Sequence, residues 1–354
     1  MRKYFLVIIL PVILVLSGCS LGGGLGTSST TVGGSFWKSA DGGKTWEAKN
    51  KISEKAVVPA EADILSLAVN PEDSRNILFG TAKNGIYKTI DGGETWTAAN
   101  FTSEKVYALA IDPRDPQTIY ASGVWQGRGK LFKSADQGIK WEEIYTSVSG
   151  GTLVIALTMS PKNPDVLYIA TSDKQVLQTL DGGHSWKNLY LADSPVVKIV
   201  LDYQDENLLY FNNVNGDVFR SQDGGKTVED ISKKLALNGS AGGNVRLVET
   251  DPNNSSWVYA GGKAGIILSK NAGETWEKIN ILNNPENFPV SALAINPLNS
   301  QEFIYGSAQA SFKTEDGGKT WTTAQFNTGK TVNLIRYDVQ NPQNVFLGLS
   351  KINY

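Results

Sequence analysis

Short apolar runs, each ended by a polar turn residue, recur along the chain from residue 35 onward. A typical pair is 109–111 followed by 118–121, with Asp112 and Pro113 opening the turn between the two runs. Runs of this length with Asp, Asn and Pro between them predict β-strands joined by tight turns. No later stretch keeps a 3.6-residue apolar period, so the pattern predicts an all-β fold.

A second motif alternates with these pairs and has the form Ser/Thr-x-Asp-Gly-Gly-x-Thr-Trp, as in residues 39–46. Its Asp can accept hydrogen bonds from the amides that follow, and the second Gly supplies the positive φ of a tight turn. The seven copies place the turn residue at Asp41, Asp91, Asp136, Asp181, Asp223, Asn271 and Asp316. The Trp at the end of six copies is expected to pack between repeats: Trp46, Trp96, Trp141, Trp186, Trp276 and Trp321.

Each full repeat therefore holds four strands within 42 to 50 residues, which is typical of a β-propeller blade. The apolar pairs also occur seven times, and their turns open at Asn70, Asp112, Ser160, Asp202, Asp251, Asn296 and Asp338. Residues 35–48 hold only the last two strands of a repeat, and 332–349 hold only the first two. The sequence thus predicts a single seven-bladed β-propeller with a composite closing blade, which leaves no exposed sheet edge at the seam.

The N-terminal residues are typical of an export signal. Arg2 and Lys3 precede an apolar run over 4–16, which is too short to span a bilayer. The run ends in Leu-Ser-Gly-Cys at 16–19, which resembles a bacterial lipobox and implies cleavage before Cys19 and lipidation of its sulfur. An ordinary signal peptide with an incidental Cys is the alternative. We expect a signal peptide over 1–18, a lipidated Cys and Gly/Ser/Thr tether over 19–34, and the propeller over 35–354.

This organisation places the folded domain outside the cytoplasm of a bacterium, anchored by lipid. The expected location is the outer membrane if one exists, and otherwise the outer leaflet of the cytoplasmic membrane. Lys plus Arg number 33 against 35 Asp plus Glu, which gives no basis for nucleic-acid binding. One Cys and one His argue against a disulfide framework, a thiolate zinc site and a His-dependent triad, so we expect no cofactor and no metal.

The Asp-Gly-Gly motif resembles the Asp-box, or BNR repeat, and the resemblance covers residues 35–354. Propellers of this type include sialidases, two-propeller xyloglucanases, the sortilin luminal domain, and photosystem II assembly and stability factors. A single ring with a lipoprotein signal looks most like the assembly-factor type, which implies a non-catalytic platform that binds a protein or a glycan. A glycoside hydrolase or carbohydrate-binding propeller is the alternative. Sialidases bind a carboxylate through three Arg, whereas only Arg246 and Arg336 lie on predicted inner strands here.

Both kinds of turn join an odd strand to the next even strand, so they share one face of the predicted propeller. That face is nearly uniform, which favours a structural role, and the opposite face carries the variable loops. Trp125 and Arg128 lie in an unusually long loop at 121–130 on the variable face. Charged residues also interrupt the apolar inner strands: Lys198, Arg246, Glu249 and Arg336. We expect these six residues to bind the partner. A structural ion network is an equal alternative for the four inner charges, and a Trp at the rim that covers a neighbouring blade is an equal alternative for Trp125.

Overall fold

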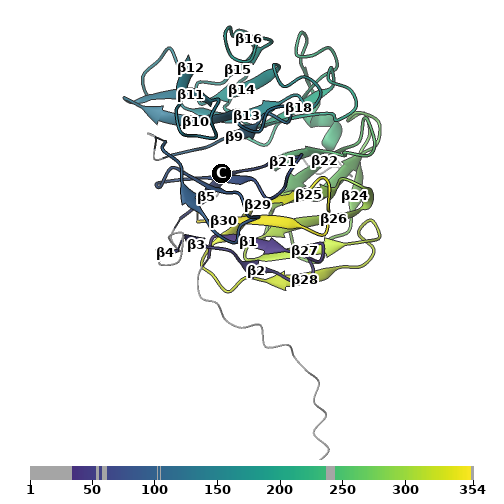
Figure 1. Ribbon diagram of the computed structural model, residues 1–354. Coiled ribbons are helices and arrows are strands. Elements are labelled where there is room, and N and C mark those ends of the chain that lie inside the picture. Colours follow the sequence, from purple (N-terminus) through teal and green to yellow (C-terminus); the bar gives the residue numbers. More distant parts are fainter. Residues whose placement is uncertain are drawn as a thin grey trace, which may run out of the picture. The chain divides into compact units, whose positions relative to one another are not determined.

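The computed structural model in Figure 1 describes residues 34–52, 56–57, 62–101, 103, 105–236 and 244–351. Within these residues every regular element is a β-strand, apart from the short 3-10 helix η1 (Ser232–Leu235). Seven antiparallel four-stranded sheets form the blades, and one further two-stranded sheet pairs β3 (Lys51–Ile52) with β4 (Ala56–Val57). The predicted all-β class and blade count are confirmed.

Six blades are continuous in sequence, and each runs from an inner strand outward. Blade 1 is β5 (Ile64–Val69), β6 (Ile77–Thr81), β7 (Ile86–Thr89) and β8 (Thr97–Ala98); blade 2 is β9 (Leu109–Ile111), β10 (Ile119–Trp125), β11 (Arg128–Ser134) and β12 (Glu142–Thr146). Blade 3 is β13 (Val154–Met159), β14 (Leu167–Thr171), β15 (Gln175–Thr179) and β16 (Lys187–Leu191); blade 4 is β17 (Val196–Leu201), β18 (Leu209–Asn213), β19 (Val218–Ser221) and β20 (Glu229–Asp230). Blade 5 is β21 (Val245–Thr250), β22 (Val258–Gly262), β23 (Gly265–Ser269) and β24 (Glu277–Ile279); blade 6 is β25 (Val290–Asn296), β26 (Asn299–Ser307), β27 (Ala310–Thr314) and β28 (Thr322–Gln325).

The seventh blade is composite, as the sequence predicts. Its strands lie in the order β29 (Thr331–Tyr337), β30 (Val345–Ser350), β1 (Phe36–Ser39) and β2 (Glu47–Ala48). The seam between the two ends of the chain is the antiparallel pair of β1 and β30, in which Phe36 lies opposite Gly348 and Ser39 opposite Val345. Consecutive inner strands contact each other around the ring, and β29 contacts β5 to close it (Figure 1).

The Asp-box turns have the local role that the sequence predicts. The Asp41 carboxylate accepts hydrogen bonds from the main-chain N–H groups of Lys44 and Thr45 at 3.0 and 2.9 Å, and from the Thr45 hydroxyl at 2.6 Å. Gly43 has a φ of +93°, a conformation that is strained for residues with a Cβ. The same bonds to the turn carboxylate lower the pKa of Asp223 and of Asp316 to about 2.

Three of the six motif Trp residues form hydrogen bonds to the neighbouring blade or to the segment that leaves it. The indole N–H of Trp96 donates to the Lys49 oxygen at 2.8 Å, that of Trp186 to the Ile144 oxygen at 3.1 Å, and that of Trp321 to the Asn280 oxygen at 3.1 Å. In each case the acceptor belongs to the preceding blade or to the segment that leaves it. Trp96 is fully buried, in edge contact with Phe36 and Phe79. The predicted packing between repeats is confirmed.

Candidate functional site

Inner-strand and turn residues of all seven blades line a hollow along the axis of the propeller. Residues at the same distance from the turn that ends each inner strand form a ring, to which each blade contributes one residue, and four of these rings carry the charged or exposed side chains of the site. The hollow divides into a larger chamber of about 650 Å³ and a smaller one of about 380 Å³. The larger chamber extends to the turns on the Asp-box face, and the smaller one lies at the opposite, variable-loop end.

The first ring, at the variable-loop end, is made by a recurrent β-bulge. The register between inner and second strand shifts at the same place in six of the seven blades, which leaves one extra residue on the inner strand. A bulge redirects its extra side chain, and here these side chains line the smaller chamber. With Tyr107 of blade 2, the first ring is Leu65, Tyr107, Ile155, Val197, Arg246, Ser291 and Asn333.

Arg246 is the one charged residue of the first ring. Its side chain is half-buried and has no hydrogen bond or ion pair to any residue that the structure describes. Its main-chain oxygen accepts a hydrogen bond from the Asn212 amide at 3.2 Å. Among the described residues Arg246 therefore offers a guanidinium without a partner at the wall of the smaller chamber.

The second and third rings carry the other inner charges. Lys198 stands in the second ring, with Ser66, Ala108, Ala156, Leu247, Ala292 and Leu334. Glu249 and Arg336 stand in the third ring, with Ala68, Ala110, Thr158, Val200 and Ala294. These three charged side chains line both chambers, so they lie where the two chambers meet.

Lys198 and Glu249 form a close ion pair across the gap between blades 4 and 5. Arg336 comes from the composite blade and reaches the Glu249 Oε1 at 3.5 Å, past blade 6, where the third ring has the small Ala294. Burial lowers the pKa of the Lys198 ammonium, the Glu249 carboxylate opposes this shift, and Arg336 adds to it. The structure thus brings three of the four predicted inner charges together, and Arg246 lies apart from them in the first ring.

Trp125 and Arg128 lie on a hairpin and not on a long loop, which corrects the expectation for residues 121–130. Strands β10 and β11 extend to a two-residue turn, Gln126 and Gly127, with φ values of +52° and +72°. Positive φ at both positions is the geometry of a tight hairpin turn. Trp125 lies directly opposite Arg128 in the register, and its side chain is 42% exposed.

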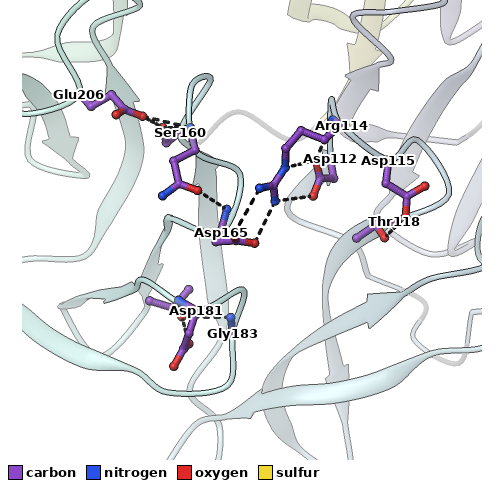
Figure 2. A network of polar contacts seen from close by, with 11 residues as sticks. Asp112, Arg114, Asp115, Thr118, Ser160, Asp165, Asp181, Gly183 and Glu206 are labelled. Carbon is purple, nitrogen blue, oxygen red and sulfur yellow. Dashed lines mark hydrogen bonds and ion pairs between the residues drawn. The ribbon is translucent and has the colours of Figure 1, made fainter.

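A network of polar contacts connects the blades along the Asp-box face. In Figure 2 the Arg114 guanidinium of blade 2 lies between Asp112 of its own turn, at 3.2 Å, and Asp165 of blade 3, at 2.9 Å. Arg114 holds the pKa of Asp165 below its usual value. The Ser160 hydroxyl of blade 3 donates to Glu206 of blade 4. These contacts support the structural role that the sequence predicts for the turns of this face.

The fourth ring lies on that same face and was not foreseen. It consists of the residues that directly follow the turn residues: Pro71, Pro113, Pro161, Tyr203, Pro252, Pro297 and Val339. The sequence contains the pattern that defines this ring, because each of its residues comes directly after one of the seven turn residues. Their convergence on the axis becomes visible only once the ring is closed.

Among the residues that the structure describes, no group of three or more His, Cys, Asp and Glu side chains is arranged to hold a metal ion. No helix in that part of the chain is long and apolar enough to cross a bilayer. The predicted lipidation site, Cys19, lies outside the described residues.

Comparisons with known proteins agree with this architecture. The family model "Sortilin, neurotensin receptor 3" (Sortilin-Vps10) matches residues 34–127, 129–234 and 216–345. Sortilin from Danio rerio is 24% identical over 211 residues, which is 57% of this chain and 25% of that protein. This chain therefore spans about a quarter of the length of that relative.

Solved structures with the same fold include enzymes and a peptide-binding protein. The GH74 enzyme of Niastella koreensis superposes with a TM-score of 0.65 at 18% identity, over 82% of this chain and 51% of that one. YCF48 bound to D1 peptide superposes with a TM-score of 0.62 at 15% identity, over 82% of this chain and 94% of that one. At these identities the likeness shows the fold alone.

Proposed function

The chain belongs to the Sortilin-Vps10 family, and on that premise we propose that it is a non-catalytic platform that binds a protein segment on its variable-loop face. The observation that carries the proposal is the exposed pair of Trp125 and Arg128 at the tip of the β10–β11 hairpin. Trp and Arg dominate the energetics of protein interfaces. The Asp-box motif does not require either residue at this place.

Main-chain hydrogen bonds hold the hairpin that carries these two side chains in place. The Gly129 N–H donates to the Thr152 oxygen at 2.6 Å, and the Gly151 N–H donates to the Gly127 oxygen at 2.8 Å. The segment before blade 3 thus braces the hairpin tip from one side. A hairpin whose main chain is already held in place loses less conformational entropy when it binds a partner.

The carboxylates of the axial hollow support binding more than hydrolysis. Glycoside hydrolysis uses two carboxyl groups that flank the scissile bond. Glu249 is the one acidic residue among the described residues that line the smaller chamber, and it is paired with Lys198. YCF48 bound to D1 peptide shows that a propeller with this fold can hold a peptide, and the GH74 neighbours keep a glycan as the second candidate ligand.

A photo-crosslinking experiment tests the face and the class of ligand together. A photoreactive residue replaces Trp125 in one full-length variant and His184, which is exposed on the Asp-box face, in a control variant. Irradiation in the envelope of the producing bacterium should yield protein adducts from position 125 and none from position 184. Adducts from position 184 alone would place binding on the other face. Release of sugar from xyloglucan, abolished by Glu249→Gln, would favour the hydrolase instead.

Affinity measurements then test the two anchor residues. Once a crosslinked segment is known, Trp125→Ala and Arg128→Ala should each weaken its binding about thirtyfold, which corresponds to about 2 kcal/mol. The melting temperature should stay unchanged because both side chains are exposed. His184→Ala and Lys226→Ala on the Asp-box face should leave the affinity unchanged.

We also propose that lipidated Cys19 holds this platform on the outer side of a bacterial membrane. The support is the sequence at 16–19 and the Gly-rich tether that follows it. Cys19→Ala should release the protein into the soluble fraction or leave it unprocessed. Unchanged membrane fractionation of this variant would contradict the lipid anchor and would leave the binding face untouched.

A further inference from the structure

We propose that the variable-loop face of the propeller lies on the surface of an anionic lipid bilayer, held there by lysines at the tips of its hairpins and by exposed apolar side chains between them. The inference rests on the proposed membrane anchor, which brings the protein to a bilayer, and adds which face meets the lipid. The partner segment that Trp125 binds would then lie at the membrane surface.

Cations recur at one place on the variable-loop face. In six blades the second and third strands join there in a hairpin, and in the composite blade the end of β30 and the start of β1 meet at the same place. Two carboxylates lie at these tips, Asp173 and Asp217, and each accepts a hydrogen bond from its own hairpin. Five of the seven tips carry an exposed cation: Lys83, Arg128, Lys174, Lys263 and Lys351. The tips therefore have a net positive charge.

The four lysines of these tips are not neutralised within the protein. The ammonium groups of Lys83, Lys174 and Lys263 form no ion pair or hydrogen bond with any residue that the structure describes, and neither does that of Lys351. The main chain at the last of these is held in place, since the Lys351 N–H donates to the Asp63 carboxylate at 2.6 Å. The side chains themselves are free to reach lipid phosphates, which Lys binds as a point charge.

The opposite face has the opposite balance of charge. Its seven Asp-box turns, counted from the residue before the motif Asp or Asn to the last motif residue, contain nine Asp and Glu and five Lys. Two of these lysines pair with carboxylates, Lys44 with Glu315 at 3.0 Å and Lys270 with Glu277 at 2.6 Å. An anionic surface therefore attracts the variable-loop face and repels the Asp-box face.

Exposed apolar side chains lie between the cationic tips. Val214 takes the place of a cation at the tip of blade 4 and is 57% exposed, and Val148 lies on the segment between blades 2 and 3 and is 82% exposed. Leu191 and Phe288 are also exposed at this face. The Asp-box face carries exposed apolar residues too, so the charge selects the face. Apolar side chains and cations on one surface together favour binding to an anionic lipid interface.

The chain enters the propeller at the same face. Strand β30 leads from the Asp-box face to the variable-loop face, and β1 pairs antiparallel with it, so Phe36 at the start of β1 lies at the variable-loop end. The proposed tether over 19–34 therefore joins the propeller on the side that carries the cations. A lipid on Cys19 would hold this face near the bilayer and raise its effective concentration there.

A fluorescent label on one or the other face tests the orientation on vesicles. Ala264→Cys places a thiol beside Lys263 at the tip of blade 5, and His184→Cys places one on the Asp-box face; both positions are exposed. The full-length variants are bound to vesicles of phosphatidylcholine and phosphatidylglycerol that contain a lipid-borne quencher. We expect quenching at 264 and none at 184, and its loss in phosphatidylcholine alone or in high salt. Any other distribution of quenching between the two positions would overturn the proposal.

A triple variant tests the lysines themselves. Lys83→Gln/Lys174→Gln/Lys263→Gln should lower the ratio of docked to undocked protein about a hundredfold. Each lysine near an anionic surface contributes about fivefold, which corresponds to about 1 kcal/mol. The fraction of the label at 264 that is quenched measures this ratio, and an unchanged fraction would contradict the role of the lysines.

The matched control is Lys140→Gln/Lys226→Gln/Lys319→Gln, which replaces three exposed lysines of the Asp-box turns. It makes the same change of net charge and should leave the quenching at 264 unchanged. An equal loss in both triple variants would show that the overall charge attracts the protein, and it would overturn the assignment to this face.

The same samples separate this proposal from the two before it. The one Cys of the wild-type chain is Cys19, so a wild-type chain that takes the label has a free thiol there. The lipid anchor would then be wrong, and the label at 264 would still test the face once the wild-type signal is subtracted. Quenching at 264 without protein adducts from position 125 would contradict the binding of a protein segment alone. Adducts without quenching would contradict the lipid contact alone.

Discussion

Lys88 on blade 1 donates a hydrogen bond from its Nζ to the main-chain oxygen of Gln137, which lies in the Asp-box turn of blade 2, at 2.9 Å. The contact recurs around the ring because the residue before the first Ser or Thr of the motif is usually long and polar. Lys38 donates to the Gly92 oxygen at 3.0 Å, Gln178 to the Gly224 oxygen at 3.4 Å, and Arg220 to the Ala272 oxygen at 2.6 Å. Blade 5 has Leu268 at this position. In these four blades the strand before the motif thus binds its blade to the next one.

These hydrogen bonds between blades should stabilise the protein by different amounts, depending on how deeply each donor is buried. Arg220 is 4% exposed and also pairs with Glu229 and Glu274, which are each about half exposed. Arg220→Met should cost about 2 kcal/mol, less than a fully buried pair costs because solvent screens the two carboxylates. Lys88→Met breaks one bond near the surface and should cost less than about 1 kcal/mol. Chemical denaturation measures both, and a larger effect at Lys88 than at Arg220 would contradict this explanation.

Because the composite blade closes the ring, removing its C-terminal strands should destabilise the protein more than these single substitutions do. Deleting the chain from Val332 onward removes β29 and β30, which leaves the N-terminal pair β1 and β2 without its two inner strands. The unpaired edge of β1 and the faces of the neighbouring blades that pack against β29 would then face solvent and invite aggregation. We expect the truncated protein to melt well below the full chain or to aggregate. Equal melting temperatures in a thermal scan would show that β1 does not need β30.

The sequence predicts the repeating parts of this fold well and the positions between repeats less well. Asp41 and its counterparts bond within their own turns, so short-range sequence is sufficient to predict them. Arg246 lines the axis because of a bulge, and a bulge depends on how two strands pair, which the spacing of apolar residues does not reveal. Trp125 lies at the tip of a hairpin for a similar reason. The Gln-Gly pair after it was the signal for a two-residue turn, and the length of the segment alone suggested a loop.

The hydrogen bonds between blades are the opposite case. The residues that donate them recur at one position of the sequence repeat, but their acceptors can be identified only in the folded ring. Lys38, Lys88 and Arg220 precede their motifs at the same position. Their acceptors lie 49 to 54 residues away, on the next blade. The fourth ring is a further example, because prolines after turn residues are ordinary in any loop and acquire a shared location only when seven turns meet around one axis.

The Asp-box carboxylates predict how stability depends on pH. The hydrogen bonds to Thr320, Thr314 and Lys319 lower the pKa of Asp316 to about 2 in the folded protein, from an unfolded value near 3.8. A carboxyl group with a depressed folded pKa stabilises the fold above its unfolded pKa, and this stabilisation is lost as the pH falls through the folded pKa. The melting temperature should therefore fall between about pH 4 and pH 2.

Asp316→Asn isolates this contribution. Blade 5 shows that Asn fits the turn, because the Asn271 Oδ1 accepts the Thr275 N–H at 2.9 Å. The variant should be less stable than the wild type at pH 7, and the difference should shrink from about pH 4 downward and vanish below about pH 2, where the Asp316 carboxyl becomes protonated in the folded protein too. Melting temperatures of both proteins across the pH range measure this, and a constant difference down to pH 2 would refute the assignment.

Lys198, Glu249 and Arg336 meet at the junction of the two chambers. We expect a single substitution there to lower the free energy of unfolding more than a double substitution does. Glu249 pairs with Lys198 and lies 3.5 Å from Arg336, and the side chains of Glu249 and Lys198 are 16% and 24% exposed. Glu249→Gln leaves two cations facing each other without a counter-ion. Because a charge without its partner is costly when solvent is scarce, we expect this variant to lose about 2–3 kcal/mol. The pKa of Lys198 should fall further, since the carboxylate that opposes the effect of burial is gone.

The double variant Lys198→Met/Glu249→Leu removes both members of the pair and should recover most of that loss, because apolar residues of similar volume often replace a buried ion pair without cost. Arg336 then remains as the one cation at the junction, with partial access to solvent through the chamber. Urea denaturation of the wild type, the single variant and the double variant measures the three free energies of unfolding. A double variant less stable than Glu249→Gln would show that the ion pair itself, and not the avoidance of an unpaired charge, stabilises the centre of the ring.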